Sequence, residues 1–240
     1  VDGVSYTFPL GDKTTVIAGV DTDGSALFTT ACAYGGPGAM LDDCANVSAG
    51  ITGGGLAVGA AYDFGTGFTA AAGAQTTENA VFTDESADAY ALNAAYTADS
   101  YGVSLTYGVV EAVDANSALT DEENTFTALN AYYIPEGTGL PSISVGYEIG
   151  DLGGAAATED EQTSFFIGLS WDEVGPGTAG VALGHSSTVE NVDEAYQYEA
   201  YYSYPINDGM SITPLIFTKD NVTSGKDDTT GVMVKTSFSF

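Results

Sequence analysis

The chain has 240 residues, a length that suits one large all-β domain, and its 31 glycines, 15 tyrosines and 11 phenylalanines favour strands and turns over helices. Its 33 acidic residues are accompanied by only four lysines and no arginine, which gives a formal net charge of -29. A polyanion of this kind repels phosphate backbones, so the composition excludes nucleic acid as a partner.

Apolar and polar residues alternate with a period of two along most of the chain, in segments of about ten residues. This pattern predicts about thirteen strands, each with one apolar face and one polar face. No stretch reaches the roughly 18 uncharged apolar residues that a membrane-spanning helix requires. In chain order, the clearest alternating segments lie at residues 56–62, 90–96, 101–109, 143–149, 165–171, 196–204 and 232–240.

A glycine-rich segment, residues 21–54, separates two of the predicted strands and contains both cysteines of the chain, Cys32 and Cys44. An oxidising compartment would favour a local disulfide between them, and two unpaired thiols are the alternative. No CxxC motif or histidine cluster lies nearby, so no metal site is predicted there. The run Asp21-Thr22-Asp23-Gly24 resembles the start of a calcium-binding loop, but the later acidic ligands are missing, and a turn is the better interpretation.

The polar face of the predicted strands carries residues suited to water and too polar for a dry core. We expect Asn93, Glu148, Gln197, Glu199 and Lys235 to face the interior of a water-filled barrel. The apolar face would then contact acyl chains. Together these patterns predict an all-β fold, a transmembrane antiparallel up-and-down β-barrel.

Short turns alternate with long acidic connections along the chain, as in outer-membrane barrels, which have short periplasmic turns and longer outer loops. The short turns are expected near residues 11–12, 65–66, 99–100, 175–177 and 207–209, and the long loops near 77–86, 112–122, 151–162 and 187–193. Aromatic residues beside the short turns, such as Phe68, Tyr101 and Tyr133, are typical of a membrane-interface girdle. The alternative is that aromatic residues simply favour strands.

The sequence offers little for catalysis, and we expect no enzymatic activity. The single histidine, His185, is expected at the surface of a strand end, and no nucleophile elbow or metal spacing accompanies it. The acidic run Glu159-Asp160-Glu161 lies in a polar, alanine-rich loop and is interpreted as solvated charge rather than a glycosidase pair. The alternative function is a secreted soluble β-sandwich surface or adhesion protein, with an acidic secreted hydrolase third.

The final strand resembles the C-terminal signal that the barrel-assembly machinery of outer membranes reads, with Phe238 and Phe240 as its aromatic residues. Four stretches resemble the cyanobacterial outer-membrane porins, a family related to the carbohydrate-selective porins, and the likeness covers nearly the whole chain. These stretches are SYTFPLGDKTTVIAG, ALFTTACAYGGPGAMLDDCANVSAGITGGG, AAYDFGTGFTAAAG and GVMVKTSFSF.

The resemblance implies an outer-membrane location in lipid and lipopolysaccharide, a homotrimer, and passive diffusion of small solutes and ions. Porins of this family are similar in having an N-terminal surface-layer-homology domain, followed in the chain by a barrel of about sixteen strands. Residues 1–240 would therefore be the barrel domain, with strands and that N-terminal domain upstream of the given sequence. Bacterial barrels have even strand numbers, which also predicts at least one further strand. No cofactor is expected, apart from calcium that could bridge the acidic loops to lipopolysaccharide.

In general porins, the connection equivalent to residues 21–54 folds into the lumen. The resemblance would then place Asp21, Asp23, Asp42 and Asp43 at the pore constriction, stiffened by a Cys32–Cys44 bridge. Carboxylates without opposing arginines concentrate cations in a low-dielectric pore, so we expect a cation preference. The alternative is that these aspartates solvate an outside loop.

Overall fold

The alternating segments form one antiparallel sheet of thirteen strands, which confirms the predicted all-β, up-and-down fold. The computed structural model describes residues 3–37, 41, 43–53, 55–76, 87–113, 119–137, 139–153, 159–223 and 225–239, and for residues 113, 119 and 121 only the backbone. The strands are β1 (Val4–Pro9), β2 (Thr14–Val20), β3 (Leu56–Asp63), β4 (Phe68–Thr76), β5 (Ala89–Thr97), β6 (Tyr101–Val113), β7 (Leu119–Tyr133), β8 (Ser142–Leu152), β9 (Glu161–Val174), β10 (Gly177–Val189), β11 (Gln197–Asn207), β12 (Met210–Lys219) and β13 (Thr229–Phe238).

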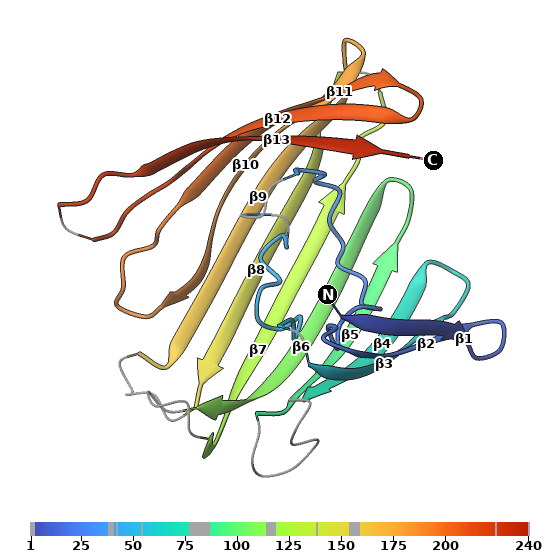
Figure 1. Ribbon diagram of the computed structural model, residues 1–240, viewed down its shortest axis with the longest axis vertical. Coiled ribbons are helices and arrows are strands. Elements are labelled where there is room, and N and C mark those ends of the chain that lie inside the picture. Colours follow the sequence, from blue (N-terminus) through green and yellow to red (C-terminus); the bar gives the residue numbers. More distant parts are fainter. Residues whose placement is uncertain are drawn as a thin grey trace.

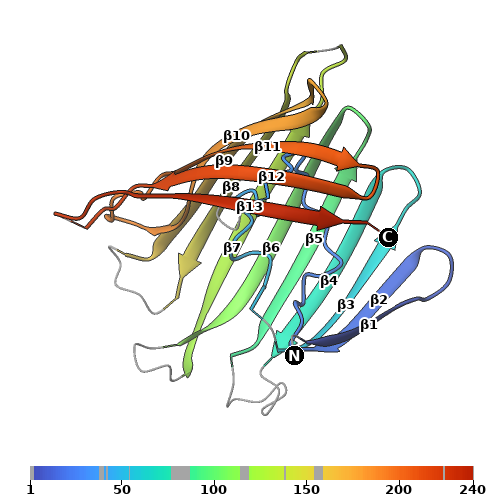
Figure 2. The same cartoon turned by 45° about the horizontal axis from the view of Figure 1, so that its top comes forward.

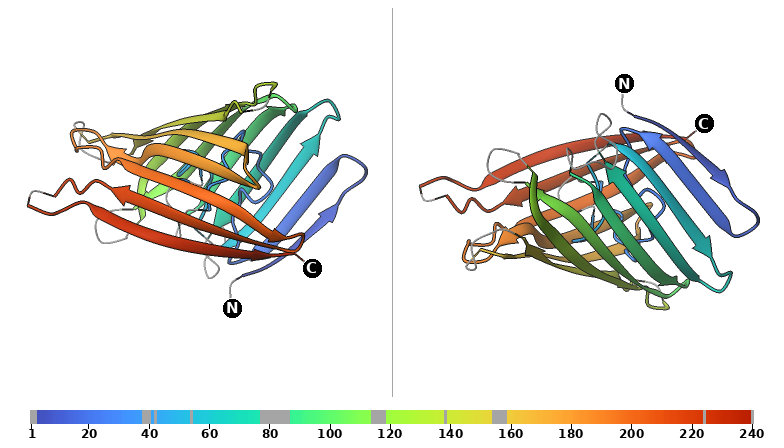
Figure 3. Two further views of the ribbon diagram at one scale, coloured as in Figure 1. Left: turned by 90° about the horizontal axis from the view of Figure 1, so that it is seen from above. Right: turned by 90° about the horizontal axis from the view of Figure 1, so that it is seen from below.

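Each strand pairs with its sequence neighbours, so the sheet order is the chain order from β1 to β13 (Figure 1). The sheet is strongly curved and has a concave and a convex face (Figures 2 and 3). Its two edges are β1 and β13, and within the described residues these edges are not paired with each other. Within the same residues, the chain has no helix long and apolar enough to cross a membrane.

The convex face is apolar and open to its surroundings. Aliphatic side chains occupy its middle, with Leu105 and Leu129 paired across β6 and β7 at 50% and 53% exposure. Tyrosines flank this band on both sides, Tyr101 and Tyr133 near the short turns, and Tyr90 and Tyr198 near the long connections. A soluble sandwich would bury such residues between two sheets, whereas a lipid-facing wall exposes them between two aromatic girdles.

The concave face carries small and polar side chains at β5 to β8 and apolar ones at β9 to β12. The connection between β2 and β3, residues 21–55, lies against this face and is called the inserted segment below. This segment runs inside the curved sheet as a blue trace (Figures 1 and 3). An apolar cluster lies where the segment meets the wall, formed by Tyr34, Leu41, Cys44, Ala45, Phe166, Ala182, Tyr201 and Leu215. The largest buried cluster is therefore inside the curved sheet, between the inserted segment and strands β9 to β12.

Two expectations of the sequence need correction. The acidic stretches expected as loops at 112–122 and 151–162 are partly strand, because the ladder continues to the pairs Val113↔Leu119 and Asp151↔Glu161. Polar side chains tolerate an exposed ladder, since the backbone groups pair with each other whatever the side chain. His185 is buried rather than at the surface, because its ring packs against Phe165 and Tyr196. The expected loop at 77–86 lies outside the described residues.

Candidate pore lining and inserted segment

Most inward positions of β5 to β8 carry small or polar side chains, as period-two alternation predicts, but the polar ones do not line open water. Asn93, Ser104, Asn130, Ser144 and Glu148 are each less than one-tenth exposed. The inserted segment lies over them and forms a hydrogen bond with each of the five. Buried polar groups need such partners, so these positions act as an attachment surface for the segment.

The outgoing arm of the segment is extended and presents alternate backbone N–H groups to the wall. Thr29 N donates to Asn93 Oδ1 at 3.0 Å, and Ala31 N donates to Ser104 Oγ at 2.8 Å. Ala33 N donates to Ser144 Oγ, also at 2.8 Å. These three bonds attach the outgoing arm to β5, β6 and β8.

The return arm is held by the carboxylate of Glu148, which is 1% exposed. Its Oε2 accepts hydrogen bonds from Ser48 N at 2.9 Å and Ala49 N at 2.8 Å, and Ser48 N also approaches Oε1 at 3.1 Å. Asn130 Nδ2 donates to the Cys44 carbonyl at 2.6 Å. Hydrogen bonds to a charged acceptor are stronger than neutral ones, so Glu148 is the main polar anchor of this arm.

Glycines in the wall let the backbone of the segment lie directly on the sheet. A Cβ at Gly73 would overlap the Gly24 carbonyl, and a Cβ at Gly146 would overlap the Cys44 carbonyl. Close backbone approach of this kind is a common use of glycine inside strands. The two glycines therefore determine how near the wall both arms can pack.

The far end of the segment is tied to β11 and to its own return arm. Tyr34 donates its hydroxyl proton to Glu199 Oε1 at 2.7 Å, and its ring packs edge-on against Phe166 and Tyr201. A disulfide joins Cys32 to Cys44 across the two arms. These contacts hold the segment along the wall.

Of the four aspartates that were expected at the constriction, the structure separates Asp21 and Asp23 from Asp43. Asp21 and Asp23 lie where the segment leaves β2, and Asp23 Oδ1 accepts a hydrogen bond from Gly53 N at 3.0 Å, which joins the two ends of the segment. Asp43 lies further in and lines a cavity of about 370 Å³ between the two arms, together with Thr30 and Asn46. Asp42 lies outside the described residues.

The other predicted site residues lie as follows. Asn93, Glu148, Gln197 and Glu199 are on the concave face, but all four are covered and no more than 5% exposed. Met233 packs against the concave core cluster, so alternation along β13 puts the exposed Lys235 on the same face. Phe238 ends β13 at 60% exposure, and Phe240 lies outside the described residues.

Sequence reasoning missed the residues that attach the segment, above all Tyr34 and Ser48 in the segment and Ser104, Asn130 and Ser144 in the wall. The available signal was the pairing of polar and glycine residues at inward positions of neighbouring strands, as at Asn130 and Gly146. In the described part of the chain, no group of three or more acidic, cysteine or histidine side chains is arranged to hold a metal ion.

Solved structures with a similar fold are porins. OprB of Pseudomonas putida aligns with a TM-score of 0.62 at 11% identity, over 99% of this chain and 72% of OprB. The anion-selective porin from Comamonas acidovorans aligns with a TM-score of 0.64 at 14% identity, over 99% of this chain and 88% of that porin. The chain has a porin-like fold.

A mutant of the Rh. blastica porin gives the same result, with a TM-score of 0.60 at 15% identity, over all of this chain and 77% of that porin. No protein-family model matches the sequence, and no curated protein matches it either. The likeness therefore concerns the porin-like fold, while the inserted segment has to be understood from its own residues.

The Tyr34 tether gives the docking of the segment a pH dependence. Burial, together with the hydrogen bond to Glu199, raises the pKa of the Tyr34 hydroxyl above its ordinary value of about 10. A released segment would have Tyr34 in water, where it loses its proton near pH 10. Docking is therefore independent of this group below about pH 9, and weakens above about pH 10 by roughly 1.4 kcal/mol per pH unit.

In the channel that we propose below, the single-channel conductance of the wild-type protein should rise as the pH is taken from about 8 to about 11, because the segment loosens. Tyr34→Phe removes the titrating hydroxyl, so its conductance should start higher and stay level over the same range. An equal alkaline rise in both proteins would show that another group is responsible.

Proposed function

We propose that the chain forms the wall of an outer-membrane channel for passive diffusion of small hydrophilic solutes and inorganic ions. The observation that carries the proposal is the opposite character of the two faces of one curved sheet. The convex face exposes aliphatic side chains between two rows of tyrosine. The concave face carries small and polar side chains at β5 to β8 and holds a segment that is attached to the wall by hydrogen bonds. Such a wall suits lipid on one side and a constricted aqueous passage on the other.

The proposed channel needs a closed wall. Unpaired backbone groups at a sheet edge are costly in lipid, and β1 and β13 are both edges in the described structure. In an antiparallel up-and-down order, β1 and β13 run in the same direction, so an odd number of further strands closes the barrel antiparallel. We propose that strands outside residues 1–240 complete it.

We further propose that the channel prefers cations. The inserted segment contributes Asp21, Asp23, Asp42 and Asp43, and the whole chain carries a net charge of -29 without any arginine. Negative charge inside a low-dielectric wall concentrates cations and repels anions. The similarly folded Comamonas acidovorans porin is described as anion-selective, so this preference rests on the charges of the present chain and not on the fold.

Conductance and reversal potential in planar bilayers test both parts of the proposal. The protein, completed by any strands that close its wall, should give stable single-channel steps, and a salt gradient should give a reversal potential with the sign of a cation-preferring pore. Absence of steps from protein that has inserted into the bilayer would contradict the channel. An anion-preferring reversal potential would contradict the selectivity alone.

Neutralising variants identify the charges responsible. Replacing the four segment aspartates by asparagine should lower the cation-to-anion permeability ratio several-fold. A control variant replaces Asp220, Asp227 and Asp228, in the connection between β12 and β13, by asparagine. It should change the ratio less, because Asp220 is partly exposed, Asp227 and Asp228 are exposed, and salt screens such charges. Equal changes in both variants would contradict a role for the segment.

A further inference from the structure

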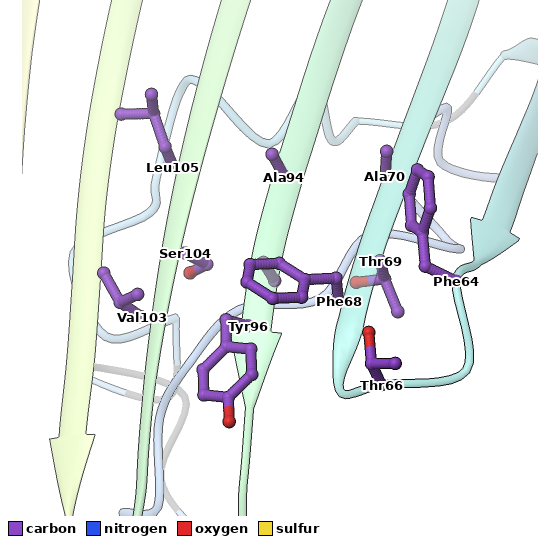
Figure 4. Close-up of a pocket in the computed structure, with 11 residues that line it drawn as sticks. Phe64, Thr66, Phe68, Thr69, Ala70, Ala94, Tyr96, Val103, Ser104 and Leu105 are labelled. Carbon is purple, nitrogen blue, oxygen red and sulfur yellow. The ribbon is translucent and has the colours of Figure 1, made fainter.

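The convex face is hollowed at the short-turn end of β4 to β6. The hollow has a volume of about 520 Å³, and its apolar lining includes Phe64, Phe68, Ala94, Val103 and Leu105. Figure 4 shows Phe64 and Phe68 on one side of it and Val103 and Leu105 on the other, with the inserted segment behind the strands. The hollow therefore belongs to the face opposite the proposed pore.

The shape of the hollow follows from the residues that pair across the strands. Ala70 pairs with Ala94 across β4 and β5, and these two small side chains form the floor of the hollow. Beside them, Phe68 pairs with Tyr96, and their rings lie 4.6 Å apart at the short-turn end. The result is a groove with a floor of methyl groups and rims of larger side chains, which fits one narrow apolar chain.

A positive charge stands beside this groove. The Lys13 ammonium donates to the Phe64 carbonyl at 3.2 Å, so it is fixed at the turn that carries one rim residue of the groove. Lys13 is exposed and is one of only four lysines in the chain. Asp12 precedes Lys13 in its turn, and Asp63 ends β3 next to Phe64, so the place suits a head group that carries an amine as well as a phosphate.

We propose that this groove binds one phospholipid of the surrounding leaflet, with an acyl chain over Ala70 and Ala94 and the phosphate at Lys13. The proposal rests on the membrane location given under the proposed function, and adds a specific lipid site to a wall that would otherwise contact lipid unspecifically. Charge is what favours a phospholipid over a second copy of the chain. A lipid phosphate fits Lys13, and its head-group amine fits Asp12 and Asp63, whereas a second copy with the same net charge of -29 would bring further negative charge to these carboxylates.

Native mass spectrometry of the detergent-solubilised protein tests the site, with dipalmitoyl phosphatidylethanolamine as the probe and dipalmitoylglycerol, which lacks the phosphate, as the comparison. The wild-type protein should retain one phosphatidylethanolamine at a lipid concentration at least several-fold lower than it needs to retain dipalmitoylglycerol. Ala94→Trp fills the groove and should abolish this binding. Ala200→Trp, on the convex face of β11, is the matched control and should retain it.

Lys13→Gln should remove the difference between the two lipids, and Lys226→Gln, between β12 and β13, should preserve it. The proposal is overturned if Ala94→Trp retains the lipid as the wild-type protein does, or if the two lipids bind equally to the wild-type protein. It is also overturned if Ala94→Trp dissociates an oligomer without loss of lipid, because the groove would then hold a second copy. Single-channel conductance separates the two proposals, since the groove lies outside the pore and Ala94→Trp should conduct like the wild-type protein.

Discussion

Leu129→Arg should destabilise the protein in lipid vesicles, lowering its free energy of unfolding by about 2–4 kcal/mol, because it places a charge on the lipid-facing side of a strand. Leu129 lies on the convex face of β7, 53% exposed, and pairs with Leu105 and Tyr147 on the neighbouring strands. In a soluble protein, arginine at so exposed a position would cost little. The effect therefore distinguishes lipid from water as the environment of this face.

Urea titration of vesicle-inserted protein measures the change, and a detergent gel comparing boiled and unboiled samples gives a second readout. Val222→Arg is the matched control, since Val222 is 43% exposed but lies in the connection between β12 and β13. It should fold like the wild-type protein. If Leu129→Arg also folds like the wild-type protein, and remains monomeric in buffer without detergent, the convex face does not contact lipid.

Glu148→Ala should release the return arm of the inserted segment and raise the single-channel conductance. The substitution removes the acceptor for the buried Ala49 N and the partly buried Ser48 N. An unpaired buried donor costs about 1–3 kcal/mol, so the loss at Ala49 N weakens docking by about that much, and the loss at the partly buried Ser48 N adds to it. This cost shifts the balance of the segment towards the undocked arrangement.

Glu148→Gln should lie between the wild-type protein and Glu148→Ala, because the amide keeps one oxygen acceptor but loses the charge. Glu136→Ala, at an exposed position in the connection between β7 and β8, should leave the conductance unchanged. If Glu148→Ala folds and conducts like the wild-type protein, the inserted segment does not limit the passage.

The fold could be predicted from local pattern alone, because period-two alternation depends only on neighbouring residues. The residues at 101–109 show this: Tyr101, Val103, Leu105 and Tyr107 all lie on the convex face of β6. The ends of strands were harder to predict. The polar residues of β7 near Glu122 and Glu123 extend the ladder beyond the apolar part, since the backbone pairs whatever the side chains are.

The environment of inward residues depended on the tertiary structure. Glu148 and Asn93 were expected to face water, but both are covered, because the inserted segment binds them with residues distant in the sequence. The contact between Ser48 and Glu148, for example, joins residues 100 positions apart. No local pattern records such a contact, so alternation identifies the inward face without showing what covers it.

The aspartates of the inserted segment lie at different depths for the same reason, because contacts between distant residues decide where each comes to lie. Asp21 follows directly on β2 with a φ of 51°, and Asp23 joins the two ends of the segment, so both remain at its base. Asp43 is carried inward with the disulfide-bonded Cys44. The sequence by itself determined the number of strands and the character of their two faces, because side chains alternate along any extended backbone. Only the tertiary structure decided which polar residues hold the inserted segment and which charges reach the interior, because these depend on where a long connection comes to rest against distant strands.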